Sequence, residues 1–327
     1  GDGDGESLKD SACTDGGGGR AVLWLQCSLR LADNPALLRA VEQAADGLAV
    51  VFVWRHGQRP STASAVFECA AAHSLDKALH KLGNRLVVLH SDDDDTKAAQ
   101  AVAQIVHKTG AQLAVLDASS KCGTSCASLL ENALSDLGNN AALEIFADSH
   151  LLLPFDVSCR ALGRSRTGGK ILRWPTYLRA AACLEVAPPL GSPHTLPPPL
   201  LDTSVDSMYA AGPLMSPFPL PDPAASGGWA RTLLRTWPVS ESTALQLART
   251  AVGATAQDDI GERPRAPPGV SKKKAKRAAS SGLKPSRLSP YLRWGVISAR
   301  QVASPCSIST FLSYLFGFLC RSSDLFF

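Results

Sequence analysis

The chain of 327 residues lacks the short motifs that mark many enzymes and metalloproteins. Its nine cysteines form no CxxC pair and its seven histidines form no HExxH or HxH pattern, so we predict no metal site. Neither a GxGxxG nor a GxxxxGK[ST] loop occurs, which argues against the usual dinucleotide and nucleoside triphosphate sites. An odd number of scattered cysteines predicts a reducing compartment rather than a disulfide framework.

Long apolar runs and a strong excess of charge are absent as well. The most apolar run, 308–320, is too short and too rich in hydroxyls to cross a bilayer, so we expect no contact with a membrane. The net charge is only +4, and a basic cluster at 263–277 accounts for all of the surplus. We therefore do not predict a general nucleic-acid-binding surface. Residues 272–277 fit either a nuclear-import or phosphate-contacting patch, or a solvated linker.

What the sequence does contain, from residue 21 on, is an alternation of short apolar runs with stretches of helical spacing. The expected strands are 21–25, 48–54, 86–89, 113–116 and 143–146, and the expected helices are 35–45, 63–82, 96–109 and 125–137. Continuously apolar strands that alternate with helices indicate a parallel sheet covered on both faces. The prediction is an α/β fold with a doubly wound, Rossmann-like, five-stranded sheet. The acidic run 91–95 lies where a helix begins, which favours helix capping over metal binding.

Composition divides the chain into segments. Residues 1–20 form a predicted disordered tail, and 21–150 form the α/β domain. A proline-rich connector covers 151–228. Helical character returns over 229–302, interrupted by a basic loop at 258–282, and residues 303–327 fit none of these patterns.

The sharpest local signal is PSRLSPYLRWG at 285–295. Ser289 before Pro290 predicts a helix that begins with Ser289 as its N-cap, and Gly295 suits the helix end. Ser298 and Gln301 have the spacing of a capping box for the next helix.

The same segment has the composition of a phosphate-binding loop. Ser286 and Ser289 offer hydroxyls, and Arg287 offers a guanidinium beside exposed N–H groups. Two well-capped short helices without a ligand explain these residues equally well.

Three segments in collinear order resemble the photolyase/cryptochrome family, and plant-type cryptochromes most closely. Residues 24–37 are similar to its opening WFRRDLRxxDNPAL, and 286–302 are similar to its flavin-phosphate loop TSxLSPxLxxGxxSxRxV. Residues 233–237 are similar to the ALLARAW that opens the plant-type helical domain. The resemblance covers roughly residues 21–302.

This resemblance implies an α/β domain that can house an antenna chromophore, joined by a connector to the beginning of an all-helical FAD-binding domain. It implies that Ser286, Leu288 and Ser289 contact the phosphates of FAD, with Arg287 at a variable position of the loop. The first hypothesis is a fragment of a blue-light photoreceptor of the cryptochrome type, with signalling proteins as partners, in the nucleus or cytoplasm, with the chloroplast left open. The second is a fragment of a light-driven DNA photolyase, a carbon–carbon lyase that acts on damaged DNA. The third is a standalone α/β module with no photochemistry.

The sequence also departs from the family pattern. Gln26, Cys27 and Ser28 replace Arg-Arg-Asp, which predicts the loss of a buried charge cluster, and Pro285 replaces a threonine. Residues 117–122 do not match the NxxYxP of the antenna site, so no antenna folate is predicted. After Val302 the isoalloxazine pocket has no counterpart, so we expect weak or absent flavin binding and no catalytic residue in the chain as it stands. We also expect aggregation or a frayed end after about Gly282.

Overall fold

The computed structural model describes residues 19–55, 61–91, 94–118, 123–147, 187–201, 221–225, 227–258 and 287–303. The predictions for the tail before residue 19, for the basic loop beyond 258 and for residues 304–327 lie outside this part of the chain.

The centre of the molecule is a five-stranded parallel sheet with the order β3-β2-β1-β4-β5. Its strands are β1 (Arg20–Leu25), β2 (Gly47–Trp54), β3 (Leu86–His90), β4 (Leu113–Ala118) and β5 (Ala142–Ala147). Strands β2 and β3 follow on one side of β1, and β4 and β5 follow on its other side. The pair β1 and β4 is therefore the topological switch point of the fold.

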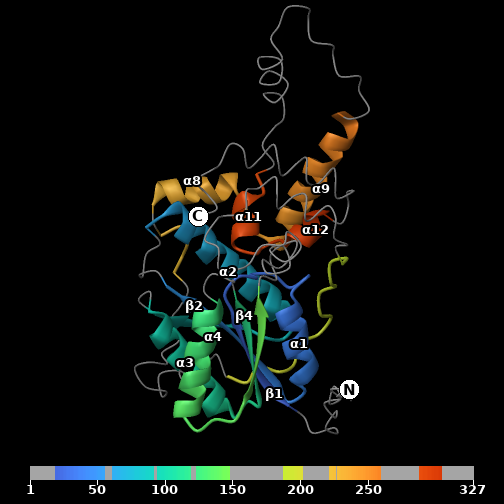
Figure 1. Ribbon diagram of the computed structural model, residues 1–327. Helices are drawn as coiled ribbons and strands as arrows, with labels where there is room; N and C mark the ends of the chain where they lie inside the picture. The colour runs from blue at the N-terminus through green and yellow to red at the C-terminus, as the bar shows by residue number, and fades with distance from the viewer. Residues whose placement is uncertain are drawn as a thin grey trace, which may run out of the picture.

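Helices cover both faces of this sheet (Figure 1). Helices α1 (Pro35–Gln43) and α2 (Ala63–Lys81) lie on one side, and α3 (Asp95–Thr109) and α4 (Gly123–Asp136) on the other. Side chains of β1 alternate between the two cores, so Leu23 packs toward α1 and α2 whereas Trp24 packs toward α3 and α4. The doubly wound α/β fold is therefore confirmed, with every predicted bound within two residues of the observed one.

Polar side chains cap the helices that follow the strands. Asn34 accepts a hydrogen bond from the Leu37 N–H at the start of α1, and Asp94 accepts from the N–H groups of Thr96 and Lys97 at the start of α3. The Asp94 contacts confirm that the acidic run begins a helix.

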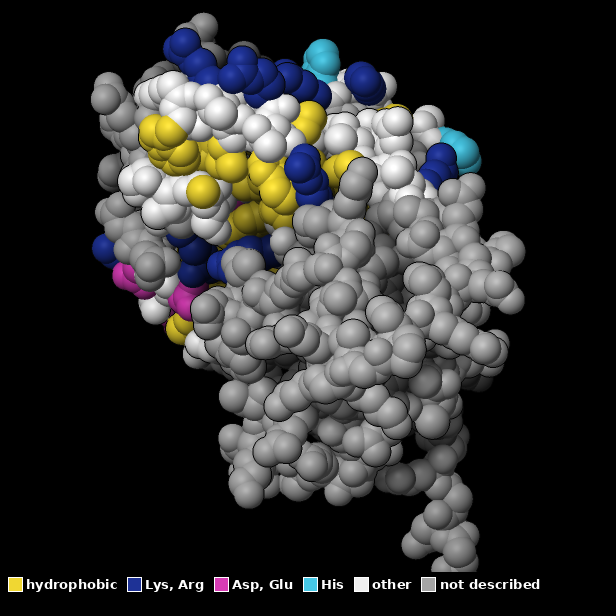
Figure 2. Space-filling view, turned by 90° about the horizontal axis from the view of Figure 1, so that it is seen from above, with side chains coloured by type: hydrophobic (Ala, Val, Ile, Leu, Met, Phe, Trp, Pro, Cys, Tyr) yellow, Lys and Arg dark blue, Asp and Glu magenta, His cyan; other side chains and the backbone are white. Residues whose placement is uncertain are grey.

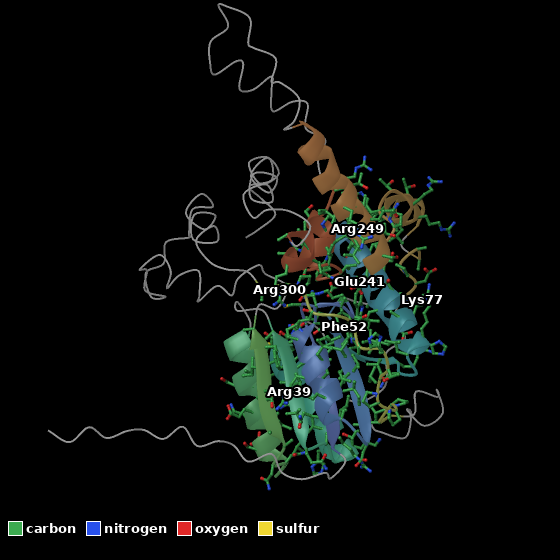
Figure 3. All side chains as sticks on the ribbon, turned by 90° about the vertical axis from the view of Figure 1, so that its right-hand side faces the viewer. Arg39, Phe52, Lys77, Glu241, Arg249 and Arg300 are labelled. Carbon is green, nitrogen blue, oxygen red and sulfur yellow. The ribbon has the colours of Figure 1, made fainter. Side chains whose placement is uncertain are left out.

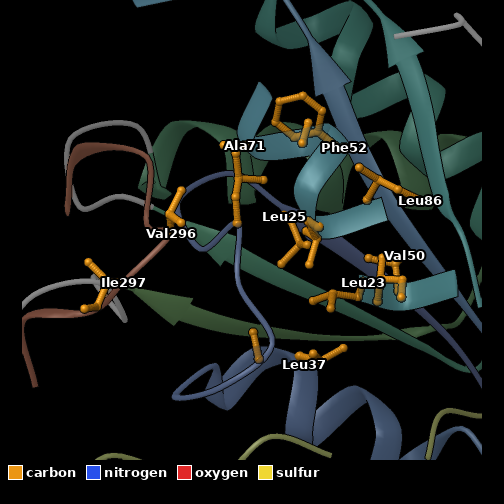
Figure 4. Close-up of a cluster of buried hydrophobic side chains, with 14 of the residues drawn as sticks. Leu23, Leu25, Leu37, Val50, Phe52, Ala71, Leu86, Val296 and Ile297 are labelled. Atoms are coloured by element: carbon orange, nitrogen blue, oxygen red, sulfur yellow. The ribbon is translucent and has the colours of Figure 1, made fainter. Parts of the chain in front are cut away.

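A helical segment lies above the carboxyl ends of the strands (Figure 1). It comprises α8 (Gly228–Thr236), α9 (Glu241–Asp258), α11 (Ser289–Arg293) and α12 (Ala299–Ala303). Val296 and Ile297, from the turn between α11 and α12, belong to the same core cluster as Leu25 and Ala71, and Figure 4 shows Val296 beside Ala71. Both Val296 and Ile297 are at most 1% exposed.

The expectation of a frayed end after about Gly282 is therefore wrong for residues 287–303. It assumed that the apolar face of this segment needs the rest of a helical domain to cover it. Instead, that face completes the core on the α1 and α2 side of the sheet.

Residues 187–201 of the connector run along the sheet as an extended chain. The Leu48 N–H donates to the Pro198 carbonyl at 2.9 Å, and the Leu200 N–H donates to the Leu48 carbonyl at 3.3 Å. Nearer its start, Leu190 and Asp33 exchange hydrogen bonds, because the Asp33 N–H donates to the Leu190 carbonyl and the Leu190 N–H donates to Asp33 Oδ1. The connector thus passes both β2 and the loop between β1 and α1.

Candidate functional site

The predicted phosphate-binding residues lie at the start of α11. Ser286 lies outside the described residues. Arg287 is exposed, Leu288 is buried and Ser289 is half-buried. The structure thus places two of the four candidates, Arg287 and Ser289, where a ligand can reach them.

The predicted N-cap is wrong by one residue. Leu288 already has helical backbone angles, and its carbonyl accepts the first helical hydrogen bond from the Leu292 N–H at 3.0 Å. Leu288 therefore occupies the N-cap position, and Ser289 is the first residue of α11. As a result, the Ser289 hydroxyl does not cap α11.

Arg287 has an unusual backbone conformation. Its φ of +56° lies in the left-handed region, which residues other than glycine rarely adopt. Its guanidinium lies over the indole ring of Trp237, 5.9 Å from the ring centroid, where the ring face attracts a cation. Backbone strain of this kind persists only where the surroundings enforce it, and it is concentrated at functional sites.

Tyr291 fixes α11 from below. It is completely buried, and its ring contacts Phe67 of α2 edge-on, with 5.2 Å between the centroids. Its hydroxyl donates a hydrogen bond of 2.9 Å to the carbonyl of Pro238. Burial raises the pKa of this phenol. The aromatic contact and the hydrogen bond hold the helix between the α/β domain and the end of α8.

The turn after α11 contacts the α/β domain directly. Gly295 ends the helix with a φ of +60°, as expected, and its carbonyl accepts a hydrogen bond of 2.9 Å from Arg30 Nη1. The predicted capping box is confirmed, because Ser298 and Gln301 exchange hydrogen bonds between side chain and backbone at 2.9 and 3.0 Å.

Below this turn lies a buried group of charges that the sequence did not predict. Arg300 forms an ion pair with the buried carboxylate of Asp33, with Nη2 2.9 Å from Oδ1, and its Nε donates to Oδ2 at 3.1 Å. The carboxylate of Glu241 accepts hydrogen bonds of 3.1 Å from the N–H groups of Leu31 and Ala32. Figure 3 shows Glu241 and Arg300 where the helical segment meets the sheet.

Arg30 lies in the same group. It is 1% exposed, and burial lowers the pKa of its guanidinium, while Asp117, Asp33 and Glu241 counteract this effect. Its Nε and Nη2 both donate to the carbonyl of Asp33.

The charges expected to be lost at 26–28 are absent there, and a different charged group lies nearby. Polar contacts replace charges at 26–28, and a charged group forms one turn further along the chain. The Ser28 hydroxyl donates to Asp117 Oδ1 at 3.1 Å, and the Cys27 N–H donates to Oδ2 at 3.0 Å. The acids and bases involved come from segments far apart in sequence, so no local pattern revealed their pairing.

A cavity of about 310 Å³ opens beside Arg287. Its wall includes Arg287, Trp237 and Tyr291, together with threonine and glutamine side chains of α8 and α9. This volume is at the lower end of the range for small-molecule sites, so the cavity can hold a part of a dinucleotide but not the whole.

The surface around this end of the molecule carries many basic groups. Figure 2, seen from above, shows hydrophobic side chains gathered between Lys and Arg side chains, with few acidic groups. The exposed arginines of this segment are Arg231, Arg235, Arg249, Arg287 and Arg293. Such a surface favours an anionic ligand.

A second polar feature lies at the switch point of the sheet. Nε2 of Gln26, directly after β1, is buried and has no hydrogen-bond partner among the described residues. An unsatisfied buried donor is costly, and a ligand with an acceptor atom would relieve it. Within the described ranges, no group of three His, Cys, Asp or Glu side chains could hold a metal ion, and no helix is long and apolar enough to cross a membrane.

Comparison with solved structures reveals the same architecture in two photolyases. A bacterial class III photolyase from Agrobacterium tumefaciens superposes with a TM-score of 0.60 at 19% identity, over 96% of this chain and 59% of its own. An archaeal photolyase from Sulfolobus tokodaii, solved with two FAD molecules, has a TM-score of 0.53 at 16% identity, over 92% of this chain and 59% of its own. The chain thus spans 59% of the length of each of these proteins, and identities this low show the fold alone.

Sequence comparison agrees with the structural likeness. No curated protein matches the chain. The family model described as DNA photolyase matches residues 21–165, which include the five strands of the sheet except Arg20 of β1. Residues 21–165 therefore match the DNA photolyase family model, and this part of the chain has the α/β fold of a photolyase.

Proposed function

We propose that the chain is part of a blue-light photoreceptor flavoprotein of the cryptochrome type, and that residues 286–289 hold the phosphates of FAD. The observation that carries the proposal is the position of Arg287. This cation is held in a strained backbone conformation, over Trp237 and at the mouth of a cavity. Strain and a preorganised cation are features of an anion-binding loop.

The residues present fit the phosphate part of FAD. Arg287 would pair with a phosphate oxygen, and the Ser289 hydroxyl, which does not cap α11, would donate a hydrogen bond to another. Trp237 and Tyr291 would form the apolar wall beside them. Bound FAD would supply the absorption of blue light and the acceptor for an electron.

The described residues do not enclose a whole flavin dinucleotide. The cavity of about 310 Å³ has room for the pyrophosphate and part of a nucleoside. We therefore expect the chain as it stands to bind FAD with a Kd weaker than about 10 μM, because most of the ligand surface would stay in water.

Two features favour a photoreceptor over a repair enzyme. Residues 233–237 resemble the opening of the plant-type helical domain, and in this structure Trp237 forms the wall beside Arg287. The basic cluster 272–277 suits nuclear import. The likeness to two photolyases supports the second candidate, a light-driven DNA repair lyase that acts on damaged DNA.

Binding of phosphate-containing fragments to the full chain tests the proposal. We expect ADP to bind measurably in calorimetry and adenosine to bind at least about tenfold more weakly, because only ADP carries the pyrophosphate. Arg287→Ala should weaken ADP binding by about tenfold, whereas Arg85→Ala, at an exposed arginine of the α/β domain, should not change it. Equal binding of ADP and adenosine would contradict a phosphate site and favour a module without photochemistry.

Light experiments on the longest available form of the protein separate the two flavin hypotheses. Light-dependent reduction of bound flavin without repair of a thymine-dimer oligonucleotide supports a photoreceptor. Repair of that oligonucleotide under blue light supports a photolyase and contradicts the first proposal.

A further inference from the structure

The loop that carries Arg287 depends on the α/β domain for its position. We propose that Gly295 is a positioning residue for the phosphate-binding loop, and that Asp117, at the end of β4, holds the surface on which Gly295 docks. This inference rests on the proposed function, because it assigns a role to residues that would not touch the flavin themselves.

The docking surface is the turn that leaves β1. Asp117 is fully buried, and its two carboxylate oxygens accept hydrogen bonds from the Cys27 N–H and the Ser28 hydroxyl. Its backbone carbonyl accepts a third, from the Gln26 N–H at 3.1 Å. A single residue of β4 therefore holds three successive residues after β1, Gln26 and Cys27 through their backbone N–H groups and Ser28 through its side chain.

Gly295 sits directly on this turn. A Cβ atom at this position would overlap the carbonyl oxygen of Cys27 and would lie 2.7 Å from its carbonyl carbon and 2.8 Å from the Cα of Ser28. Only glycine permits this approach, and only glycine adopts the required φ of +60° without strain. The hydrogen bond from Arg30 Nη1 to the Gly295 carbonyl secures the contact.

A very short helix links the position of Gly295 to the position of Arg287. Helix α11 has five residues, and hydrogen bonds link both of its ends, from the Gly295 N–H to the Leu292 carbonyl and from the Leu292 N–H to the Leu288 carbonyl. So short a helix cannot absorb a displacement by bending. A shift of Gly295 away from Cys27 would therefore move Leu288, and with it the neighbouring Arg287.

The competing explanation is that Tyr291 alone positions the loop. Tyr291 packs on Phe67 and donates to the Pro238 carbonyl, and neither contact involves Gly295. On that explanation a change at Gly295 would disturb the turn and α12 but leave the start of α11 in place.

Hydrogen exchange on the full chain separates the two explanations. The variant is Gly295→Ala, and its matched control is Gly138→Ala, because Gly138 has a similar φ of +64° but no other atom within 4 Å of an added Cβ. We expect amides at 288–294 to exchange about tenfold faster in Gly295→Ala than in the control. Faster exchange confined to 299–303, with 288–294 unchanged, would overturn the proposal.

A second variant tests the same proposal in case Gly295→Ala does not fold. Asp117→Asn keeps the shape of the side chain, but its amide nitrogen cannot accept a hydrogen bond, so one of the two bonds to Cys27 and Ser28 is lost. We expect it to raise exchange at 288–294 in the same direction as Gly295→Ala but by a smaller factor. Unchanged exchange at these amides in a folded Asp117→Asn protein would also count against the proposal.

Ligand binding then tests the link to the phosphate site. We expect Gly295→Ala to weaken ADP binding about tenfold and to leave any weak adenosine binding unchanged, because the loop would be displaced from the phosphates only. Gly138→Ala should bind ADP like the wild-type chain. If the wild-type chain does not bind ADP, the proposed function fails, whereas the exchange experiment still decides the positioning role of Gly295.

Discussion

Arg300 and Asp33, 267 residues apart in the chain, form an ion pair in which both carboxylate oxygens contact the same guanidinium. The Asp33 side chain is fully buried and that of Arg300 is 19% exposed. Asp33 itself has a φ of +51°, so its backbone is strained as well. The pair joins the loop after β1 to helix α12, and thereby two of the three segments whose sequences resemble the family motifs.

Removal of this pair should destabilise the whole chain. Arg300→Ala leaves the Asp33 carboxylate buried without its strongest partner, and we expect a loss of about 3 kcal/mol in the free energy of unfolding. Arg39→Ala is the control, because the Arg39–Glu144 pair is about one third exposed on each side and should contribute less than about 1 kcal/mol. Urea unfolding monitored by circular dichroism measures both. Equal losses in the two variants would contradict a special role for the buried pair.

Tyr291→Phe tests the hydrogen bond below α11. We expect a loss of about 1 kcal/mol at neutral pH, because the Pro238 carbonyl loses its donor. The difference in the free energy of unfolding between the wild type and Tyr291→Phe should decrease above pH ~10. The reason is that burial raises the pKa of Tyr291 in the folded state, so the unfolded phenol loses its proton first and stability falls as the pH rises. Other groups titrate in this range, so the quantity to measure is the difference between the two proteins at each pH. A constant difference from pH 8 to 11 would show that Tyr291 ionises equally in both states.

The Cys69 thiol should be unreactive in the folded chain. Burial, with smaller contributions from Glu68 and Asp222, raises its pKa to about 12. At pH 8 only about one molecule in ten thousand then carries the thiolate. Iodoacetamide followed by peptide mass spectrometry should modify the half-buried Cys27 well before Cys69, and both equally in urea. Comparable modification of the two cysteines without urea would contradict this prediction.

Asp94→Ala tests the capping interpretation of the acidic run. Asp94 accepts hydrogen bonds from two N–H groups at the start of α3, so we expect a loss of about 1 kcal/mol in stability. Lys97→Ala, on the exposed side of the same turn, should have little effect. Magnesium and calcium should not change the melting temperature of any of the three proteins. A rise in the wild type that Asp94→Ala abolishes would instead reveal a metal site.

The strands and helices of the α/β domain could be predicted because their signals are local. Runs such as 48–54 are apolar at every position and end at polar or turn-forming residues, and these features mark a buried parallel strand without reference to the rest of the chain. The sequence predicts the N-cap of α11 one residue too late. Ser289 is a preferred capping residue, whereas the backbone angles of Leu288, which place the helix start, cannot be read from the sequence.

The charged group around Arg30 could not be predicted for a different reason. Each of Arg30, Asp33, Glu241 and Arg300 looks like an ordinary surface charge in its own segment. Their pairing follows from the packing of α9 and α12 against the loop after β1, which no local pattern encodes. The candidate site was found in part, because the resemblance located the loop, whereas the contact of Gly295 with Cys27 appeared only in three dimensions.

The edge-to-face contact of Phe67 with Tyr291 has a consequence for folding during synthesis. After Phe67 has emerged from the ribosome, more than two hundred further residues must be synthesised before Tyr291 emerges. This takes on the order of ten seconds or more. During that time the sheet can form, but the part of α2 around Phe67 has no cover. The nascent chain therefore offers an apolar surface to molecular chaperones until the last described helices arrive.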